Sequence, residues 1–292
     1  MKSLPRIAAI ILALALSLGL AACSAIKLGY STLPELAFWW IDGYVDFSEE
    51  QEPDARRELA RLHDWHRREE LPKLIEILAR MEAMAAEEVT PQQACDIVAQ
   101  VQVRIAAVAG QAAAGMGAMA PTLSAQQLRH LERKYRSRNE DFFKKWISRP
   151  APQQHEKRYE QMLDRLESVY GRLDAPQRGV LRQAIERSMY NPGRILSERQ
   201  RWQQDVLQAL RQASVPDTSP AAATALVHAA LQRMQQPPDV SYRAWRDALI
   251  QESCRTFAAV HQATTPAQRE QAVRRLRAYQ RDLRELALSA RV

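Results

Sequence analysis

The strongest constraint on the fold is a helix-start signal that recurs along the chain. Residues 90–93 (Thr-Pro-Gln-Gln), 124–127 (Ser-Ala-Gln-Gln) and 265–268 (Thr-Pro-Ala-Gln) each place a hydroxyl side chain three positions before a glutamine, and residues 174–177 (Asp-Ala-Pro-Gln) are a close variant. In such a capping box the first side chain and the glutamine satisfy backbone N–H groups that the first helical turn leaves unpaired. Apolar residues at helical spacing follow these boxes, so the signals predict helices.

Extending this pattern gives a chain made of helices throughout. We expect a short helix over 34–42 and a long one over 48–71, with Ser48 as cap, Gln51 as its partner and Pro72 as a kink or break. Further helices are expected over 91–114, 125–147, 153–170, 176–190, 194–213, 221–235, 241–262 and 266–288. The chain has only 9 glycines and no alternating β-branched run. The predicted class is all-α, an elongated bundle of about nine to eleven helices.

The first 23 residues predict export. Lys2 and Arg6 precede an apolar run over residues 7–20, and Leu20-Ala21-Ala22-Cys23 ends it. Fourteen apolar residues are too few to span a bilayer, which takes about 20. The segment therefore has the features of a cleaved signal peptide, 1–22. Its end resembles the lipobox of bacterial lipoproteins. That resemblance implies a mature chain beginning at Cys23, which carries a diacylglycerol and an N-acyl chain, with no other cofactor.

The residue after the cysteine and the chain's charge indicate where the protein lies and what it meets. Ser24 stands where an inner-membrane retention signal often has Asp, which favours the periplasmic face of the outer membrane over that of the inner membrane. The net charge is +7, and most of the excess lies after residue 157. A basic surface often indicates nucleic acid. An exported lipoprotein meets little of it, so we expect a membrane tether and an envelope protein or an anionic envelope component as partner.

The domain organisation follows from these features. After the signal we expect a lipid-anchored segment, 23–47, with a short aromatic helix. A single helical domain, 48–292, follows, in which two sub-bundles could meet near residue 150.

Two cysteines remain in the mature domain, Cys95 and Cys254. In an oxidising compartment an even pair favours a disulfide, and two separate buried thiols are the alternative.

Two candidate surfaces lie in the first quarter of the chain. The first is the aromatic segment 38–47, whose candidate residues are Trp39, Trp40, Asp42 and Tyr44. These rings could pack the N-terminus onto the bundle, which we favour, or rest at a membrane interface. The second comprises His63, His66, Arg67 and Glu70, which share one helix face. His63, His66 and Glu70 are candidates for a Zn²⁺ site. Because Arg67 would repel the ion, an inter-helix polar cluster is the favoured alternative.

The third candidate surface is the charged segment 135–146. Its candidate residues are Arg136, Arg138, Asn139, Glu140 and Asp141. We expect pairs four residues apart, Arg136 with Glu140 and Asp141 with Lys145, on a solvated or partner-facing helix surface.

Sequence templates for catalysis are missing. The chain has no nucleophile elbow and no phosphate-binding loop. Glu252-Ser253 is similar to the Glu-Ser pair of lytic transglycosylases, but that family's other motifs are absent. A non-enzymatic binding protein is therefore the main hypothesis. A peptidoglycan-acting enzyme using Glu252 and a metal-binding lipoprotein using His63 and His66 are the alternatives.

One resemblance covers most of the mature chain. The lipobox, Trp-Trp-Ile-Asp-Gly-Tyr at 39–44, Trp-His-Arg-Arg-Glu-Glu-Leu-Pro at 65–72 and Arg-Asn-Glu-Asp-Phe at 138–142 resemble a family of uncharacterised proteobacterial lipoproteins. The resemblance implies an exported helical protein and no catalytic residue, since the family is defined as a domain of unknown function.

Overall fold

The computed structural model describes residues 26–288, and within that range the chain is all-α, as predicted, with eleven α-helices and no strand. The helices are α2 (Leu33–Val45), α3 (Glu52–Trp65), α4 (Leu71–Ala86), α5 (Pro91–Met119), α6 (Ala125–Phe142), α7 (Ala151–Tyr170), α8 (Ala175–Glu186), α9 (Pro192–Ala213), α10 (Pro220–Gln235), α11 (Val240–Gln262) and α12 (Pro266–Leu288). A helical segment over residues 26–31 precedes α2. The predicted signal peptide and Cys23 lie outside the described residues, so both remain predictions.

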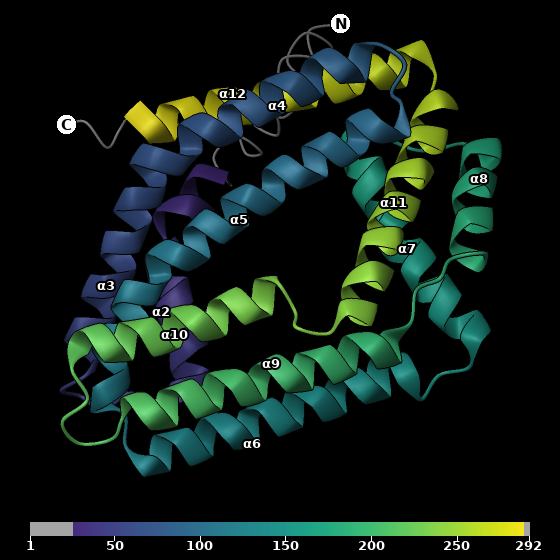
Figure 1. The fold of residues 1–292 in the computed structure, drawn as a ribbon. Coiled ribbons are helices and arrows are strands. Elements are labelled where there is room, and N and C mark those ends of the chain that lie inside the picture. Colours follow the sequence, from purple (N-terminus) through teal and green to yellow (C-terminus); the bar gives the residue numbers. More distant parts are fainter. Residues whose placement is uncertain (1–25, 289–292) are drawn as a thin grey trace, which may run out of the picture.

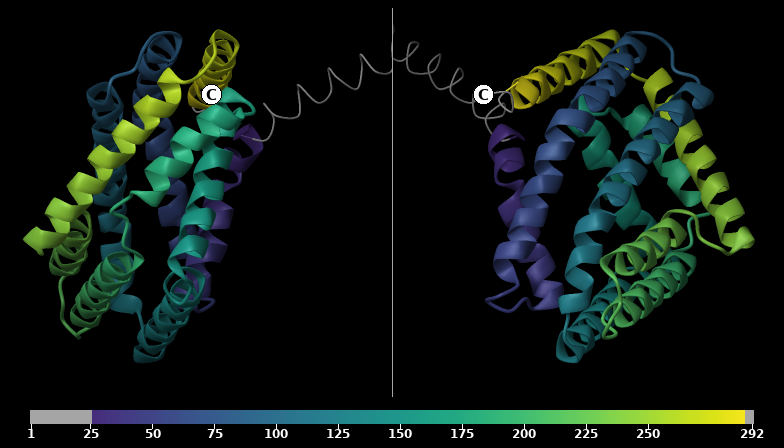
Figure 2. Two further views of the ribbon diagram at one scale, coloured as in Figure 1. Left: turned by 90° about the vertical axis from the view of Figure 1, so that its right-hand side faces the viewer. Right: turned by 60° about the vertical axis from the view of Figure 1, so that its left-hand side comes forward.

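The helices follow a four-sided outline (Figure 1). Helices α4 and α12 pack side by side along one edge, and α6 and α9 pair along the opposite edge. Helix α5 runs between α3, α10 and α11 and contacts all three. Helix α2 lies on the outer side of α3 (Figure 2). The N-terminal helices therefore form one outer surface of the molecule.

The apolar core is divided into two large clusters and a small one. One large cluster joins the second half of α5 to α6, α9 and α10, with Ala120, Ala213 and Ala223 fully buried at its centre. The other joins α4, α7, α8, α11 and α12. The small cluster contains Cys95 and Cys254 and lies where the first turns of α5 meet α11. Each large cluster thus combines segments that are far apart in the sequence.

Several expected helix boundaries differ in the structure: the helix expected over 34–42 continues to Val45, and the one expected over 176–190 ends at Glu186. Three further differences have a local cause. Helix α3 begins at Glu52 and not at Ser48, because residues 49–51 form a turn in which the Gln51 side chain accepts from the Ser48 N–H at 3.0 Å. Pro72 does not break the helix. The chain widens into a π-helical turn, η1 (His66–Glu70), and Pro72 follows in the first turn of α4, where its missing N–H is tolerated.

The third difference is that α5 does not end at residue 114, just before Gly115, but continues to Met119. Gly117 is needed there, since a Cβ at that position would lie 2.5 Å from the Thr224 Cα of α10. The glycines near the end of α5 therefore allow its neighbours to approach closely and do not mark a loop. Helix α5 with the following turn (Pro91–Thr122) is also the one helix in the described range that is long and apolar enough to cross a membrane. In this structure it packs against four neighbouring helices, α3, α4, α10 and α11.

The capping glutamines do more than close their own helices. All four predicted boxes form, at 90–93, 124–127, 174–177 and 265–268. The Gln177 and Gln268 amides also bond each other reciprocally, with N···O distances of 2.7 and 3.0 Å. Each then donates to the carbonyl two residues before the partner's cap, Gln177 to Ala263 and Gln268 to Arg172. We call this arrangement the glutamine clasp.

The same clasp joins the starts of α3 and α6. The Gln127 amide donates to Gln51 at 2.6 Å and to the Asp46 carbonyl at 2.8 Å. Gln51 in turn donates to the Thr122 carbonyl at 2.7 Å, again two residues before the partner's cap. Two pairs of helix starts, 76 and 91 residues apart, are thus joined by one side-chain arrangement.

Candidate functional site

An apolar chamber of about 430 Å³ lies between α2, α3 and α5. Its walls are formed mainly by aliphatic side chains and small residues: Ile41, Val45, Ala55, Leu59, Leu62, Ala112, Ala114, Gly115, Met116 and Met119. The chamber exists because α5 carries alanine and glycine where it faces α3, and such side chains fill little of the space between two helices. The two methionines are flexible apolar side chains that can adapt to an occupant.

The polar groups of the chamber are few. Glu58 and Arg61 of α3 form an ion pair with each other, and Gln111 of α5 also contributes to the lining. The Arg61 side chain is mostly exposed whereas that of Glu58 is largely covered. A Cβ at Gly115 would lie 2.8 Å from a Glu58 carboxylate oxygen, so the glycine makes room for this carboxylate beside α5. The chamber suits an apolar ligand with one polar end.

The predicted histidine cluster fastens the N-terminal segment to the end of α3, where His63 lies, and to η1, where His66 and Arg67 lie. The Tyr30 hydroxyl is hydrogen-bonded to His66 Nδ1 at 2.9 Å, and His63 Nε2 donates to the Tyr30 carbonyl at 3.0 Å. The Tyr30 and His63 rings lie 4.6 Å apart, and the Arg67 guanidinium lies 5.6 Å from the Tyr30 ring. We call Tyr30, His63, His66 and Arg67 the N-terminal clamp. Sequence reasoning missed Tyr30 because a lone tyrosine near the predicted anchor carries no pattern.

Burial sets the protonation of the clamp. It lowers the pKa of His66, and it lowers the pKa of His63 together with the nearby Arg67 charge. Burial also raises the pKa of Tyr30 to about 12, so the hydroxyl keeps its proton. The clamp therefore consists of neutral rings beside one arginine.

Glu70 does not face the histidines. Its carboxylate is 1% exposed and accepts from Lys73 Nζ at 2.8 Å, with Arg104 of α5 at 3.5 Å. It thus ties the end of the π-helical turn to α5, and neither cation belonged to the sequence-predicted cluster. Within residues 26–288 no group of three His, Cys, Asp or Glu side chains could hold a metal ion.

The aromatic segment 38–47 has features of both alternatives considered for it, because some of its rings pack inward and others face solvent. Phe38 is fully buried against α3, whereas Trp39 and Trp40 are mostly exposed. Asp42 accepts a hydrogen bond from the Phe47 N–H at 2.9 Å, and Tyr44 packs on Tyr135 of α6 with ring centroids 6.2 Å apart. The segment therefore both anchors the N-terminus and presents two indole rings outward.

The charged segment of α6 lies on a different surface. Arg136, Asn139 and Glu140 line a hollow of about 530 Å³ between α6 and α9, whose walls are partly polar and partly apolar. The Asn139 amide donates to the buried Gln203 side chain at 2.7 Å. The expected pair of Asp141 with Lys145 is wrong, since Asp141 lies 3.6 Å from Arg138, and no ion pair joins Arg136 to Glu140. Nothing brings this segment together with His63 and His66.

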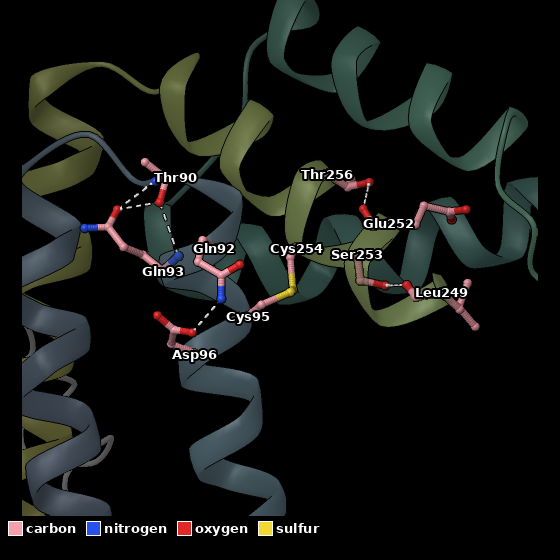
Figure 3. Close-up of a disulfide and its surroundings, with 10 residues drawn as sticks. All are labelled: Thr90, Gln92, Gln93, Cys95, Asp96, Leu249, Glu252, Ser253, Cys254 and Thr256. Carbon is pink, nitrogen blue, oxygen red and sulfur yellow. Dashed lines mark hydrogen bonds between the residues drawn. A yellow bond between two sulfur atoms is a disulfide. The ribbon is translucent and has the colours of Figure 1, made fainter. Parts of the chain in front are cut away.

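Cys95 and Cys254 form a disulfide between α5 and α11, with a Cα–Cα distance of 5.5 Å (Figure 3). It lies next to the capping box at 90–93 and borders a second apolar cavity of about 350 Å³. Buried His261 lines that cavity. Its Nε2 donates to the Glu87 carbonyl at 2.7 Å, and its Nδ1 lies 2.8 Å from the Tyr170 hydroxyl.

Comparison with protein-family models identifies the family to which this chain belongs. Residues 43–230, more than half of the chain, match the family of unknown function DUF6279. The chain belongs to this family. No curated protein matches the chain, and no solved structure does either. The DUF6279 region contains His63, His66, Glu70, nearly the whole chamber lining and the Arg136–Asp141 segment. Tyr30, Trp39, Trp40 and Cys254 lie outside it.

Glu252, the residue considered for lytic chemistry, also lies outside the DUF6279 region. One carboxylate oxygen accepts from the Ser188 hydroxyl, and the other accepts from the Met189 N–H at 2.9 Å. Arg158 donates to the same Ser188 hydroxyl at 3.0 Å. Glu252 thus holds the loop between α8 and α9 against α11, a contact that sequence reasoning did not foresee.

Proposed function

We propose that this DUF6279 protein is a lipid-anchored lipoprotein of the bacterial envelope, held on the periplasmic face of the outer membrane, which acts by binding. Its ligand is an envelope component with an acyl chain and an anionic end. The acyl chain occupies the chamber between α2, α3 and α5, and Arg61 meets the anionic end.

The apolar chamber is the observation that carries this proposal. Its volume of about 430 Å³ lies within the roughly 300–1,000 Å³ of small-molecule sites, which combine apolar walls with a few polar groups. One wall is α2, the helix that follows the predicted lipid anchor. A lipid at the membrane surface is therefore the apolar molecule nearest to the chamber.

The side chains considered for catalysis or metal binding are already held in hydrogen bonds within the protein. This supports a binding function over a catalytic one. Both oxygens of Glu252 accept hydrogen bonds from the 188–189 loop, and both histidines of the clamp are bonded to Tyr30. These contacts position backbone segments. None of these groups lines either of the two apolar cavities.

Fractionation of Cys23→Ser tests the anchor. We expect the unsubstituted protein in the outer-membrane fraction with acyl chains on its N-terminal residue, and the variant uncleaved and unacylated. One acyl chain gives marginal binding, and two or more hold a protein stably. Equal processing and fractionation of both proteins would overturn the anchor.

Displacement of a fluorescent fatty acid, cis-parinaric acid, by palmitate tests the chamber. Ala112 lines the chamber, so Ala112→Phe fills it and we expect at least about tenfold weaker binding, a loss of about 1.4 kcal/mol. Ala118→Phe is the matched control, because Ala118 is exposed on the same helix and does not line the chamber. Equal binding by both variants, or no binding by the unsubstituted protein, would remove this ligand class.

A further inference from the structure

Helix α2 is apolar on two opposite faces. Its inner face carries Phe38, Ile41 and Val45, which pack on α3 or line the chamber. Its outer face carries Leu33, Leu36, Trp39 and Trp40, which are 46%, 58%, 62% and 65% exposed. At about 100° per residue these four side chains lie opposite the inner set. An apolar helix face is normally covered by protein or by lipid. The outer face of α2 therefore lacks its covering surface.

The outer face is ordered and carries no unpaired charge. The Trp39 ring packs edge-on against Phe38 at 5.5 Å, and the Arg56 guanidinium lies 5.4 Å from it. The Trp40 ring lies 4.9 Å from that of Tyr44. Helix α2 has no lysine or arginine, and Glu35 pairs with Arg56. Both indoles are thus held in place while most of their surface meets solvent.

We propose that the outer face of α2 lies in the interfacial layer of the bilayer that holds the acyl chains of Cys23. This inference rests on the proposed lipid anchor and goes beyond it, because an anchor alone leaves the domain free to tumble on its tether. Only three residue steps separate Cys23 from residue 26, a reach of about 10 Å at most. The N-terminal clamp then fixes residues 26–31 to α3. The tether is therefore too short to carry α2 far from the lipid surface.

The side-chain chemistry also matches a bilayer interface. Trp and Tyr side chains prefer the level of the headgroups, where one part of the ring is apolar and another is wet. Lys27 pairs with Glu285, which places the end of α12 beside the N-terminal segment (Figure 2). Arg281 and Arg284 are exposed on that end of α12, where they can meet anionic headgroups. In this orientation α2 separates the bilayer from the chamber.

Spin labelling of the full-length lipidated protein tests the orientation. With Cys23 acylated and Cys95 bonded to Cys254, Leu36→Cys introduces the single free thiol of the mature chain. Val240→Cys is the matched control, since Val240 is 68% exposed and lies on α11. Each nitroxide-labelled variant is bound to phosphatidylethanolamine–phosphatidylglycerol vesicles, floated, and exposed to oxygen and to a water-soluble nickel reagent.

We expect a label at position 36 to meet the nickel reagent several-fold less often than a label at 240, and oxygen more often, because a polar complex is excluded from the apolar layer whereas oxygen enters it. Equal accessibility at both positions in floated protein would overturn the docking and leave the anchor intact. Protection at position 36 from both reagents would overturn it in favour of a second copy of this chain covering α2. Failure of both variants to float would instead contradict the anchor.

Discussion

At the scale of single residues, one buried histidine, His261, and two half-buried ones, His63 and His66, make stability depend on pH. Burial lowers the pKa of His63, His66 and His261 below the ordinary 6.5. As the pH falls below about 6.5 the unfolded chain takes up these protons before the folded chain does. Their contribution to the free energy of unfolding is therefore fully present above about pH 6.5 and decreases as the pH falls toward the folded-state pKa values.

We predict that His261→Gln removes part of this pH dependence. A glutamine amide can donate to the Glu87 carbonyl and accept from Tyr170 as the imidazole does, but it does not titrate. Urea unfolding between about pH 5 and 8 measures the slope, and His228→Gln at an exposed position is the control. The prediction is wrong if the variant keeps the slope of the unsubstituted protein.

At the scale of helices, the glutamine clasp predicts that two capping glutamines with the same sequence pattern contribute differently to the free energy of unfolding. Gln177 is 1% exposed, and its amide serves its own cap, Gln268 and the Ala263 carbonyl. Gln177→Ala leaves several buried polar groups unpaired, and we expect a loss of about 2–4 kcal/mol. Gln93→Ala removes an exposed capping partner and should cost about 1 kcal/mol or less.

Denaturant unfolding of Gln177→Ala and Gln93→Ala provides this comparison. Gln268→Ala, alone and combined with Gln177→Ala, measures the coupling between the two glutamines of the clasp. The double variant should lose less than the sum of the two single losses, because either substitution already breaks the reciprocal pair. Additive losses would contradict the clasp as an energetic unit.

The helix α5 offers a second prediction at this scale, in which one substitution has opposite signs at two glycines. Gly117→Ala forces the Thr224 backbone of α10 outward and should cost about 1–3 kcal/mol. A Cβ at Gly110 meets nothing within 4 Å, so Gly110→Ala should stabilise by up to about 1 kcal/mol through helix propensity. Thermal unfolding of the two variants measures both changes in stability. A loss of stability for Gly110→Ala as well as for Gly117→Ala would contradict the prediction that helix propensity dominates at Gly110.

These elements also show which features were accessible from the sequence. A capping box is local, so the four boxes and the helices that follow them could be predicted. The pairing of Gln177 with Gln268 depends on which helix starts meet, and no local pattern encodes that. The π-helical turn before Pro72 was missed for a related reason, because it is stabilised partly by the long-range contact of Glu70 with Arg104. The chamber could not be foreseen, since small residues on α5 create space only once α2 and α3 lie opposite them.

At the scale of the whole molecule, the Cys95–Cys254 disulfide is the covalent link between regions that pack separately. It closes a loop of 159 residues and joins the start of α5 to α11, whereas the second half of α5 belongs to the core of α6, α9 and α10. Closing a loop of this length stabilises by about 5 kcal/mol in the chain-entropy model. The prediction of pairing rested on compartment alone, because sequence does not show whether two thiols meet.

We therefore predict that the double variant Cys95→Ala, Cys254→Ala unfolds at a markedly lower denaturant concentration, with a loss of up to about 5 kcal/mol. Because the chamber is formed by the opposite end of α5, cis-parinaric acid binding should survive in the folded variant. Reduction of the unsubstituted protein should reproduce the loss of stability, while reductant should leave the double variant unchanged. If the double variant equals the oxidised protein in stability, the non-covalent contacts between α5 and α11 already hold the two cores together and the disulfide adds nothing measurable.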